Sequence, residues 1–207
     1  RDLAPGMIYK IDNGRLVRVQ HEPSEETIER ILGLFGDEPK EFLRYVEIWA
    51  RLLEYPAPKF RRVALDIEVL PPVVEREGVK TARIPDPDEA EYPVICASLY
   101  GSDGKKRILL LRRENIREGT VKIPSDVSLE YYSSEEKMVS EIFGALFDYP
   151  FVITFNGDDF DLRYLFHRAQ KLGFKRSQIP IEVGRRICLL THNVHIDLYK
   201  FFFNKSI

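Results

Sequence analysis

Two acidic clusters are the residues of this chain whose types and spacing could do chemistry. Asp66-Ile67-Glu68 ends one apolar run, and the segment Asn156–Asp161 ends another. Side chains alternate between the two faces of a strand, so Asp66 and Glu68 point the same way and Ile67 points into the core. Adjacent carboxylates repel each other unless a cation lies between them, and Asp161 offers a third oxygen ligand. Carboxylates suit Mg²⁺ or Mn²⁺, ions that serve the cleavage or joining of phosphodiesters.

The second cluster is the more specific of the two. Asp-x-Glu is a common tripeptide, and it gains weight here only because a carboxylate inside an apolar strand needs a partner. In the second cluster, Gly157 allows backbone to approach a ligand closely, and Phe160 can anchor the turn in the core. Asp161 then lies at the start of a helix, near the partial positive charge of the helix N-terminus.

Two apolar runs must position these clusters, and both are predicted to be buried strands. The first spans Val63–Val69 and the second spans Phe151–Phe155. Runs that are apolar on both faces are typical of central strands. A helix is predicted after the second cluster, because apolar residues from Leu162 to Leu172 recur at helical spacing, and Gly173 ends it.

The other segments complete an α/β fold, a mixed central sheet flanked by helices. Both clusters then lie where strands finish, the usual place for sites in such sheets. Ser133 with Glu136 reads as a capping box for one helix. The remaining predicted elements are a loop over residues 75–91, a hairpin of Val94–Tyr100 and Arg107–Leu111, that capped helix ending near Phe147, and a β-prone stretch, Val194–Tyr199.

A small segment precedes this fold. A hairpin is predicted from Met7–Ile11 and Arg15–Val19, because Asn13-Gly14 is a strong turn signal. Two helices follow, one capped by Ser24 and ending near Gly33, the other from about Pro39 to Leu53. The proline-rich run Tyr55–Pro58 reads as a linker, so the domain boundary is placed near residue 60.

Composition narrows the class of protein. The chain has 207 residues with 44% apolar and 31% charged residues and a formal net charge of −2. This charge argues mildly against a freestanding nucleic-acid binder, although a local basic channel stays open. Cys96 and Cys188 are interpreted as buried thiols in a reducing compartment. No signal peptide is found, and no run reaches the length of about 20 apolar residues that a membrane-spanning helix needs.

Together these residues resemble the proofreading 3′→5′ exonuclease domain of family B DNA polymerases. Asp66-Ile67-Glu68 resembles the first exonuclease motif of that family, and Asn156–Asp161 resembles the second. The segments Tyr92–Ile95 and Thr154–Leu162 resemble archaeal members, and His195–Tyr199 also resembles the family. The helical segment before residue 60 is most similar to crenarchaeal replicative polymerases. The resemblance covers essentially the whole chain, most firmly from Arg62 onward.

The resemblance implies a ribonuclease-H-like fold and a site of four acids that binds two divalent metal ions, Mg²⁺ or Mn²⁺. Asp66, Glu68 and Asp161 match three of these catalytic, metal-binding acids. The fourth is an Asp in a Tyr-x-x-x-Asp motif, which is absent after residue 161. The implied reaction is two-metal hydrolysis of the 3′-terminal phosphodiester of DNA, with release of a nucleoside monophosphate. Asn156 and Phe160 are implied to hold the terminal nucleotides.

The chain is therefore interpreted as a fragment of a replicative DNA polymerase. It lacks an initiator Met and stops before the third motif would arrive. Residues 1–60 would be a hairpin and helical connecting segment, and residues 61–207 a C-terminally incomplete exonuclease domain. The expected partners are the single-stranded 3′ end of a DNA primer, the rest of the polymerase and a sliding clamp, with no membrane. The expected location is the cytoplasm, at the nucleoid of an archaeal cell.

Two other functions stay open. Without the fourth acid, the piece could be a catalytically inert nucleic-acid-binding module. A small freestanding exonuclease of the same superfamily is the third hypothesis, and the missing motif counts heavily against it. The remaining polar residues near the motifs are predicted to be structural or solvent-facing: turn residues Asp158 and Asp159, solvent-exposed His167, structural His192 and His195, and Asp197 in a structural hydrogen bond.

Overall fold

The structure is a computed structural model with two compact units. It describes residues 9–19, 24–53, 59–71, 73–76, 79–82, 84–114, 119 and 121–203. Contacts between residues divide the chain between Lys59 and Phe60. The predicted linker Tyr55–Pro58 lies outside the described residues. Within the described part of the chain, no helix combines the length and apolar character needed to cross a membrane.

The first unit contains a hairpin and two helices. Strands β1 (Tyr9–Asp12) and β2 (Arg15–Arg18) pair antiparallel, and Asn13 and Gly14 between them take φ values of 47° and 74°. This confirms the predicted turn, since that turn type needs two residues with positive φ. The helices are α1 (Glu25–Gly33) and α2 (Lys40–Leu53). The predicted cap of α1 is also confirmed, because the Ser24 hydroxyl accepts from the Thr27 amide at 3.4 Å.

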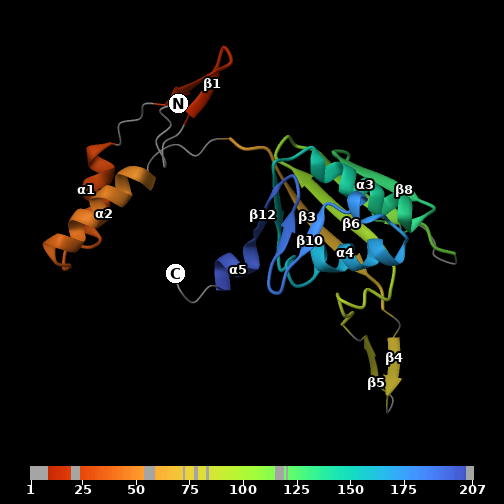
Figure 1. The fold of residues 1–207 in the computed structure, drawn as a ribbon. Helices are drawn as coiled ribbons and strands as arrows, with labels where there is room; N and C mark the ends of the chain where they lie inside the picture. Colours follow the sequence, from red (N-terminus) through yellow and green to blue (C-terminus); the bar gives the residue numbers. More distant parts are fainter. Residues whose placement is uncertain are drawn as a thin grey trace. The chain divides into compact units, whose positions relative to one another are not determined.

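The second unit is built on a six-stranded mixed sheet with the order β12-β9-β3-β6-β7-β8 (Figure 1). Strand β3 lies near its centre, parallel to β9 and antiparallel to β6. The outer pairs β12–β9 and β7–β8 are parallel. The sheet strands are β3 (Arg62–Val69), β6 (Val94–Gly101), β7 (Lys106–Leu111), β8 (Val127–Tyr132), β9 (Phe151–Thr154) and β12 (Val194–Asp197).

Three α-helices, a 3₁₀ turn and two small hairpins complete the described part of this unit. They are α3 (Glu135–Phe147), α4 (Asp161–Lys171), α5 (Leu198–Phe203), a 3₁₀ turn at Arg176–Gln178, the pair β4 (Val73–Arg76) and β5 (Val79–Ala82), and the pair β10 (Ile181–Val183) and β11 (Cys188–Leu190). One sheet face packs against α3 and α4, and residues from all three form the core. This packing of helices on a mixed sheet confirms the predicted α/β class. Side chains of β3 alternate between its faces, with Val63, Leu65 and Ile67 buried and their neighbours exposed.

Several predicted elements were wrong or missing. The predicted loop 75–91 contains part of the β4–β5 hairpin. Strands β8, β10 and β11 were missed, because β8 mixes polar and apolar residues and the other two have three residues each. The stretch Val194–Tyr199 does not stay extended to its end, since the strand stops at Asp197 and α5 begins at Leu198.

The predicted capping box of α3 is wrong by one residue. Ser134, not Ser133, caps the helix by accepting from the Lys137 amide at 3.4 Å. Both serines could cap by sequence. The cap at Ser134 makes Glu135 the first residue of the helix, and its carboxylate pairs with Arg168 at 2.6 Å and accepts from the Val94 amide at 2.8 Å. These tertiary contacts hold the start of the helix.

Candidate active site

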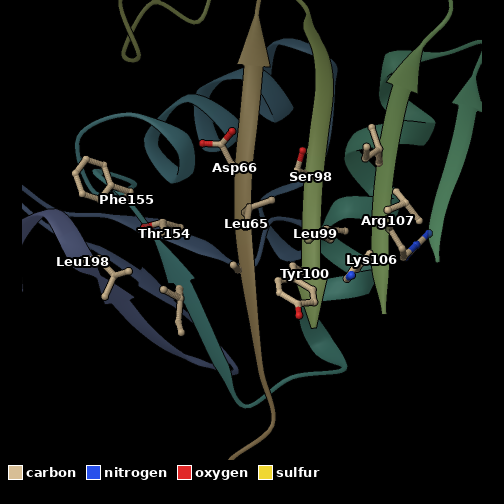
Figure 2. A pocket seen from close by; sticks show the side chains of 14 residues that line it. Leu65, Asp66, Ser98, Leu99, Tyr100, Lys106, Arg107, Thr154, Phe155 and Leu198 are labelled. Atoms are coloured by element: carbon tan, nitrogen blue, oxygen red, sulfur yellow. The ribbon is translucent and has the colours of Figure 1, made fainter. Parts of the chain in front are cut away.

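The first acidic cluster lies on the open face of β3. Asp66 and Glu68 are exposed on that face, and Ile67 is 4% exposed and packs into the core. The predicted alternation is thereby confirmed. Figure 2 shows Asp66 near the carboxyl end of β3, beside an apolar hollow of about 420 Å³ that Leu65, Tyr100 and Phe155 help to line. Asp66 therefore borders an apolar surface on the sheet face opposite to α3 and α4.

The second cluster forms a tight turn between β9 and α4. Asn156 takes a φ of 67°, a left-handed conformation that Asn tolerates better than most residues. Gly157 follows in a space with no room for a side chain, because an added Cβ would lie 2.2 Å from the Thr154 hydroxyl oxygen. The Phe160 amide then donates to the Asn156 carbonyl at 2.9 Å, which closes the turn. Gly is thus required for close packing of the turn on β9.

Phe160 holds this turn against the body of the domain. Its ring is partly buried against the core and lies 5.6 Å from the Tyr164 ring, centroid to centroid. The predicted anchoring role is confirmed. Asn156 is half-buried. The roles of Asn156 and Phe160 in holding DNA stay predictions.

Asp161 is the residue that joins the two clusters. It is the first residue of α4, as predicted, and its side chain is buried, with 3% of the residue exposed. One carboxylate oxygen accepts a hydrogen bond from the Ile67 amide at 3.0 Å, across 94 positions of sequence. That amide belongs to the residue between Asp66 and Glu68, so the bond ties Asp161 to the backbone of the first acidic cluster.

Burial perturbs the protonation of Asp161. The pKa of Asp161 is raised to about 7, chiefly because the carboxylate loses its surrounding water. The hydrogen bond from the Ile67 amide opposes this rise, and the negative charges of Asp66 and Asp197 contribute to it. A carboxylate with these surroundings is costly to ionise unless a positive charge comes near. Asp161 is therefore electrostatically unsatisfied when ionised.

The donor chemistry fits a hard divalent cation. Asp66, Glu68 and Asp161 offer only carboxylate oxygens, which Mg²⁺ and Mn²⁺ prefer, and a cation would offset the electrostatic cost at Asp161. Their side chains nevertheless do not form a complete cage. Over the described ranges, no three His, Cys, Asp or Glu side chains come close enough together to hold a metal ion.

Behind the turn lies a layer of buried polar groups whose extent the sequence did not reveal. Asp158 is 4% exposed, and its carboxylate accepts from the Cys188 amide at 2.5 Å and from the Lys200 ammonium at 2.8 Å. Asp158 lies in the turn, as predicted, but its side chain is buried and links the turn to Cys188 and Lys200. His195 bonds Thr154 through Nε2 at 2.8 Å. The structural roles predicted for His195 and Asp197 are confirmed, since Asp197 accepts from three backbone amides.

One expectation about a charged residue needs correction, and one basic run that could have formed a local channel is paired with acids. His167 is not free in solvent, because its Nε2 lies 3.3 Å from an Asp88 oxygen and only 26% of its side chain is exposed. The basic run Lys105–Arg107 is no unpaired channel. Arg107 bonds both Glu130 and Glu141 at 2.7 Å, and Lys106 bonds Asp126 at 2.5 Å.

The fold and its acidic strand define the class of protein. A mixed central sheet flanked by helices is the ribonuclease-H-like fold of exonuclease domains. The family model described as DNA polymerase family B, exonuclease domain, matches residues 43–206. The chain belongs to this family. The match begins within α2, so it extends ahead of the boundary at Lys59.

The relatives include crenarchaeal polymerases, as the sequence motifs predicted. The chain is 42% identical over 206 residues to DNA polymerase 1 of Saccharolobus solfataricus, covering 99% of this chain and 22% of that protein. It is 39% identical to DNA polymerase 1 of Sulfurisphaera ohwakuensis, with 99% and 22% covered, and 35% identical to that of Aeropyrum pernix, with 98% and 20% covered. The chain therefore spans about a fifth of the length of these curated relatives.

Proposed function

We propose that this domain performs 3′→5′ proofreading within a replicative DNA-directed DNA polymerase, with Asp66, Glu68 and Asp161 as its catalytic, metal-binding acids. The hydrogen bond from the Ile67 amide to Asp161 carries the proposal. It joins two clusters that are far apart in sequence. One of them, Asp66 and Glu68, is exposed on the open face of the sheet, where a DNA end has access. Membership of the exonuclease family supports the same assignment.

The three acids have distinct tasks in this proposal. Asp66 and Glu68 are exposed and face the substrate side, so they would hold divalent ions against the terminal phosphate. Asp161 is buried and held by the Ile67 amide, so its carboxylate would add negative charge on the buried side of the ions. Two bound Mg²⁺ or Mn²⁺ ions would supply an activated water and stabilise the leaving 3′-oxygen.

Asn156 and Phe160 would position the DNA end. The left-handed backbone of Asn156 places its half-buried amide side chain in the turn that presents Asp161. Phe160 stiffens this turn through its packing on the core. We infer that the substrate is the single-stranded 3′ end of a primer, because a mismatched end frays at lower free-energy cost than a paired one.

The activity of the whole polymerase is part of the same proposal. The relatives are named DNA polymerase 1, and a parent chain of that kind would extend primers on DNA and release nucleoside monophosphates when it edits. We infer that a sliding clamp would contact the parent through regions outside residues 1–207. The parent polymerase would act at the nucleoid.

An inert nucleic-acid-binding module is the second candidate. One observation favours it: among the residues that the structure describes, no three acids or other ligands converge to hold an ion. In that case the domain would hold a DNA end without cutting it. The two candidates differ in a directly measurable way.

The test is cleavage of a 5′-labelled single strand in Mn²⁺ by the polymerase chain that carries this domain, beside the 207-residue chain. Hydrolysis by the longer chain that is lost in Asp66→Ala supports the exonuclease. Glu136→Gln is the matched control, since Glu136 is an exposed acid in the first turn of α3. Binding of the strand without hydrolysis by the longer chain would favour the inert module, and unchanged hydrolysis in Asp66→Ala would remove the metal assignment.

A further inference from the structure

Asp197, the last residue of β12, is bound to the turn that carries the candidate site. Only 8% of Asp197 is exposed. One carboxylate oxygen accepts from the amides of Asn156 at 2.8 Å and Tyr199 at 3.0 Å. The other oxygen accepts from the Asp158 amide at 3.1 Å. Two of these three donors lie in the turn between β9 and α4.

The turn needs an acceptor at this point. Asn156 has a left-handed φ of 67°, and Gly157 is pressed against Thr154, so the backbone leaves the regular path of the strand. Amides on such a path lose their sheet partners, and a buried amide without an acceptor costs about 1–3 kcal/mol. β12 pairs with β9 so that Asp197 lies opposite Thr154. Its carboxylate is thus delivered to the start of the turn.

The turn also determines where Asp161 lies. The Phe160 amide donates to Asn156 and the Leu162 amide donates to Gly157, both at 2.9 Å. These bonds connect the held end of the turn to the first residue of α4. At that end, Asp161 meets the Ile67 amide at 3.0 Å. A displacement of the turn would therefore move Asp161 relative to Asp66 and Glu68.

We propose that Asp197 is a positioning residue for phosphodiester hydrolysis, which holds the Asn156 and Asp158 amides so that Asp161 is presented to the first acidic cluster. The inference rests on the proposed exonuclease function. Asp197 itself acts through the turn and touches no reacting atom. Its carboxylate is suited to the task because both oxygens accept, whereas an amide offers one oxygen and one donor group.

Asp197→Asn separates positioning from simple folding. The amide oxygen can still serve Asn156 and Tyr199, but the NH₂ group would face the Asp158 amide as a second donor. Asp159→Asn is the matched control, because it makes the same charge change at an exposed position of the same turn. Both variants belong in the full polymerase chain that carries this domain, for kinetics, and in the 207-residue chain, for hydrogen exchange.

We expect kcat for hydrolysis of a single-stranded 3′ end to fall about tenfold or more in Asp197→Asn, because groups that orient metal ligands commonly contribute 10–100-fold. KM for DNA should change by less than kcat, although the turn also carries Asn156 and Phe160, because their side chains are unchanged and Asp66 and Glu68 on β3 stay in place. Hydrogen exchange at the Asn156 and Asp158 amides should accelerate, while amides of Val63 and Leu65 in β3 stay protected. Asp159→Asn should leave all four measurements unchanged.

Two results would overturn the inference. One is a kcat in Asp197→Asn equal to that of the unmodified chain. The other is faster exchange throughout β3, which would make Asp197 a folding residue only. Asp66→Ala in the same chain tests the parent proposal separately: if that variant cuts as well as the unmodified chain, the assignment of the metal-binding acids fails, and exchange at Asn156 and Asp158 alone decides whether Asp197 holds the turn.

Discussion

Replacing the buried acid Asp161 by Asn should change how the stability of the domain depends on pH. The pKa of Asp161 rises from 3.8 to about 7 on folding, chiefly because the carboxylate is buried. The folded state therefore binds a proton between these two values that the unfolded state has already lost, so this group's contribution to stability is present at low pH and is lost as pH rises through about 7.

The size of the effect follows from the shift. One pKa unit corresponds to about 1.4 kcal/mol, so between about pH 5 and pH 8 this group should remove roughly 3 kcal/mol of unfolding free energy. Asn cannot ionise, and its side-chain oxygen can still accept from the Ile67 amide. Asp161→Asn should therefore lose about 3 kcal/mol less than the unmodified chain over the same interval.

Urea denaturation in EDTA at several pH values measures this difference directly. Asp159→Asn serves as the control, because Asp159 is an exposed acid two positions away. Comparing the variants cancels the other titrating groups. Parallel curves of stability against pH for the unmodified chain and Asp161→Asn would refute the reasoning, and they would mean that the Asp161 carboxylate is ionised in the fold without penalty.

Three further predictions concern the turn, the core and the metal. Gly157→Ala should lower the unfolding free energy by roughly 1–3 kcal/mol in urea denaturation, because the new Cβ would overlap Thr154; an unchanged midpoint would contradict the packing described. Glu135→Gln should cost about 3 kcal/mol, since it removes the carboxylate that compensates the charge of Arg168, whose side chain is only 14% exposed, whereas the exposed Glu136→Gln should cost little. Mn²⁺ should raise the melting temperature of the unmodified chain, and more so above about pH 7, where Asp161 ionises; an equal rise in Asp66→Ala would place the ion elsewhere.

The sequence was sufficient for the parts of the site that depend on local pattern. The alternation at Asp66, Ile67 and Glu68 was predictable because one strand fixes which side chains share a face. The helix that begins at Asp161 was predictable from its apolar spacing, and its end was predictable from Gly173, which takes a φ of 86°. Both features need only neighbouring residues.

The contacts between distant segments could not be predicted in this way. The bond from the Ile67 amide to Asp161 depends on β3 and β9 pairing in parallel. The burial of Asp158 depends on Cys188 and Lys200 arriving from later segments. Asp158 and Asp159 look alike in sequence, yet one is buried and the other exposed. Only the tertiary arrangement distinguishes them.

The place of β12 at the edge of the sheet has a consequence for the order of folding. The turn and α4 follow β9 directly, but the acceptor for the turn's amides arrives about 40 positions later, with Asp197. Contacts between distant segments form slowly because the loop between them must close first. We expect the exonuclease site to mature after the central strands, so pulse-labelled amides of Val63 and Val152 should become protected before those of Asn156 and Asp158. Simultaneous protection of all four amides would exclude this order. In the expected order, a chain still being synthesised would form its central strands before its candidate site.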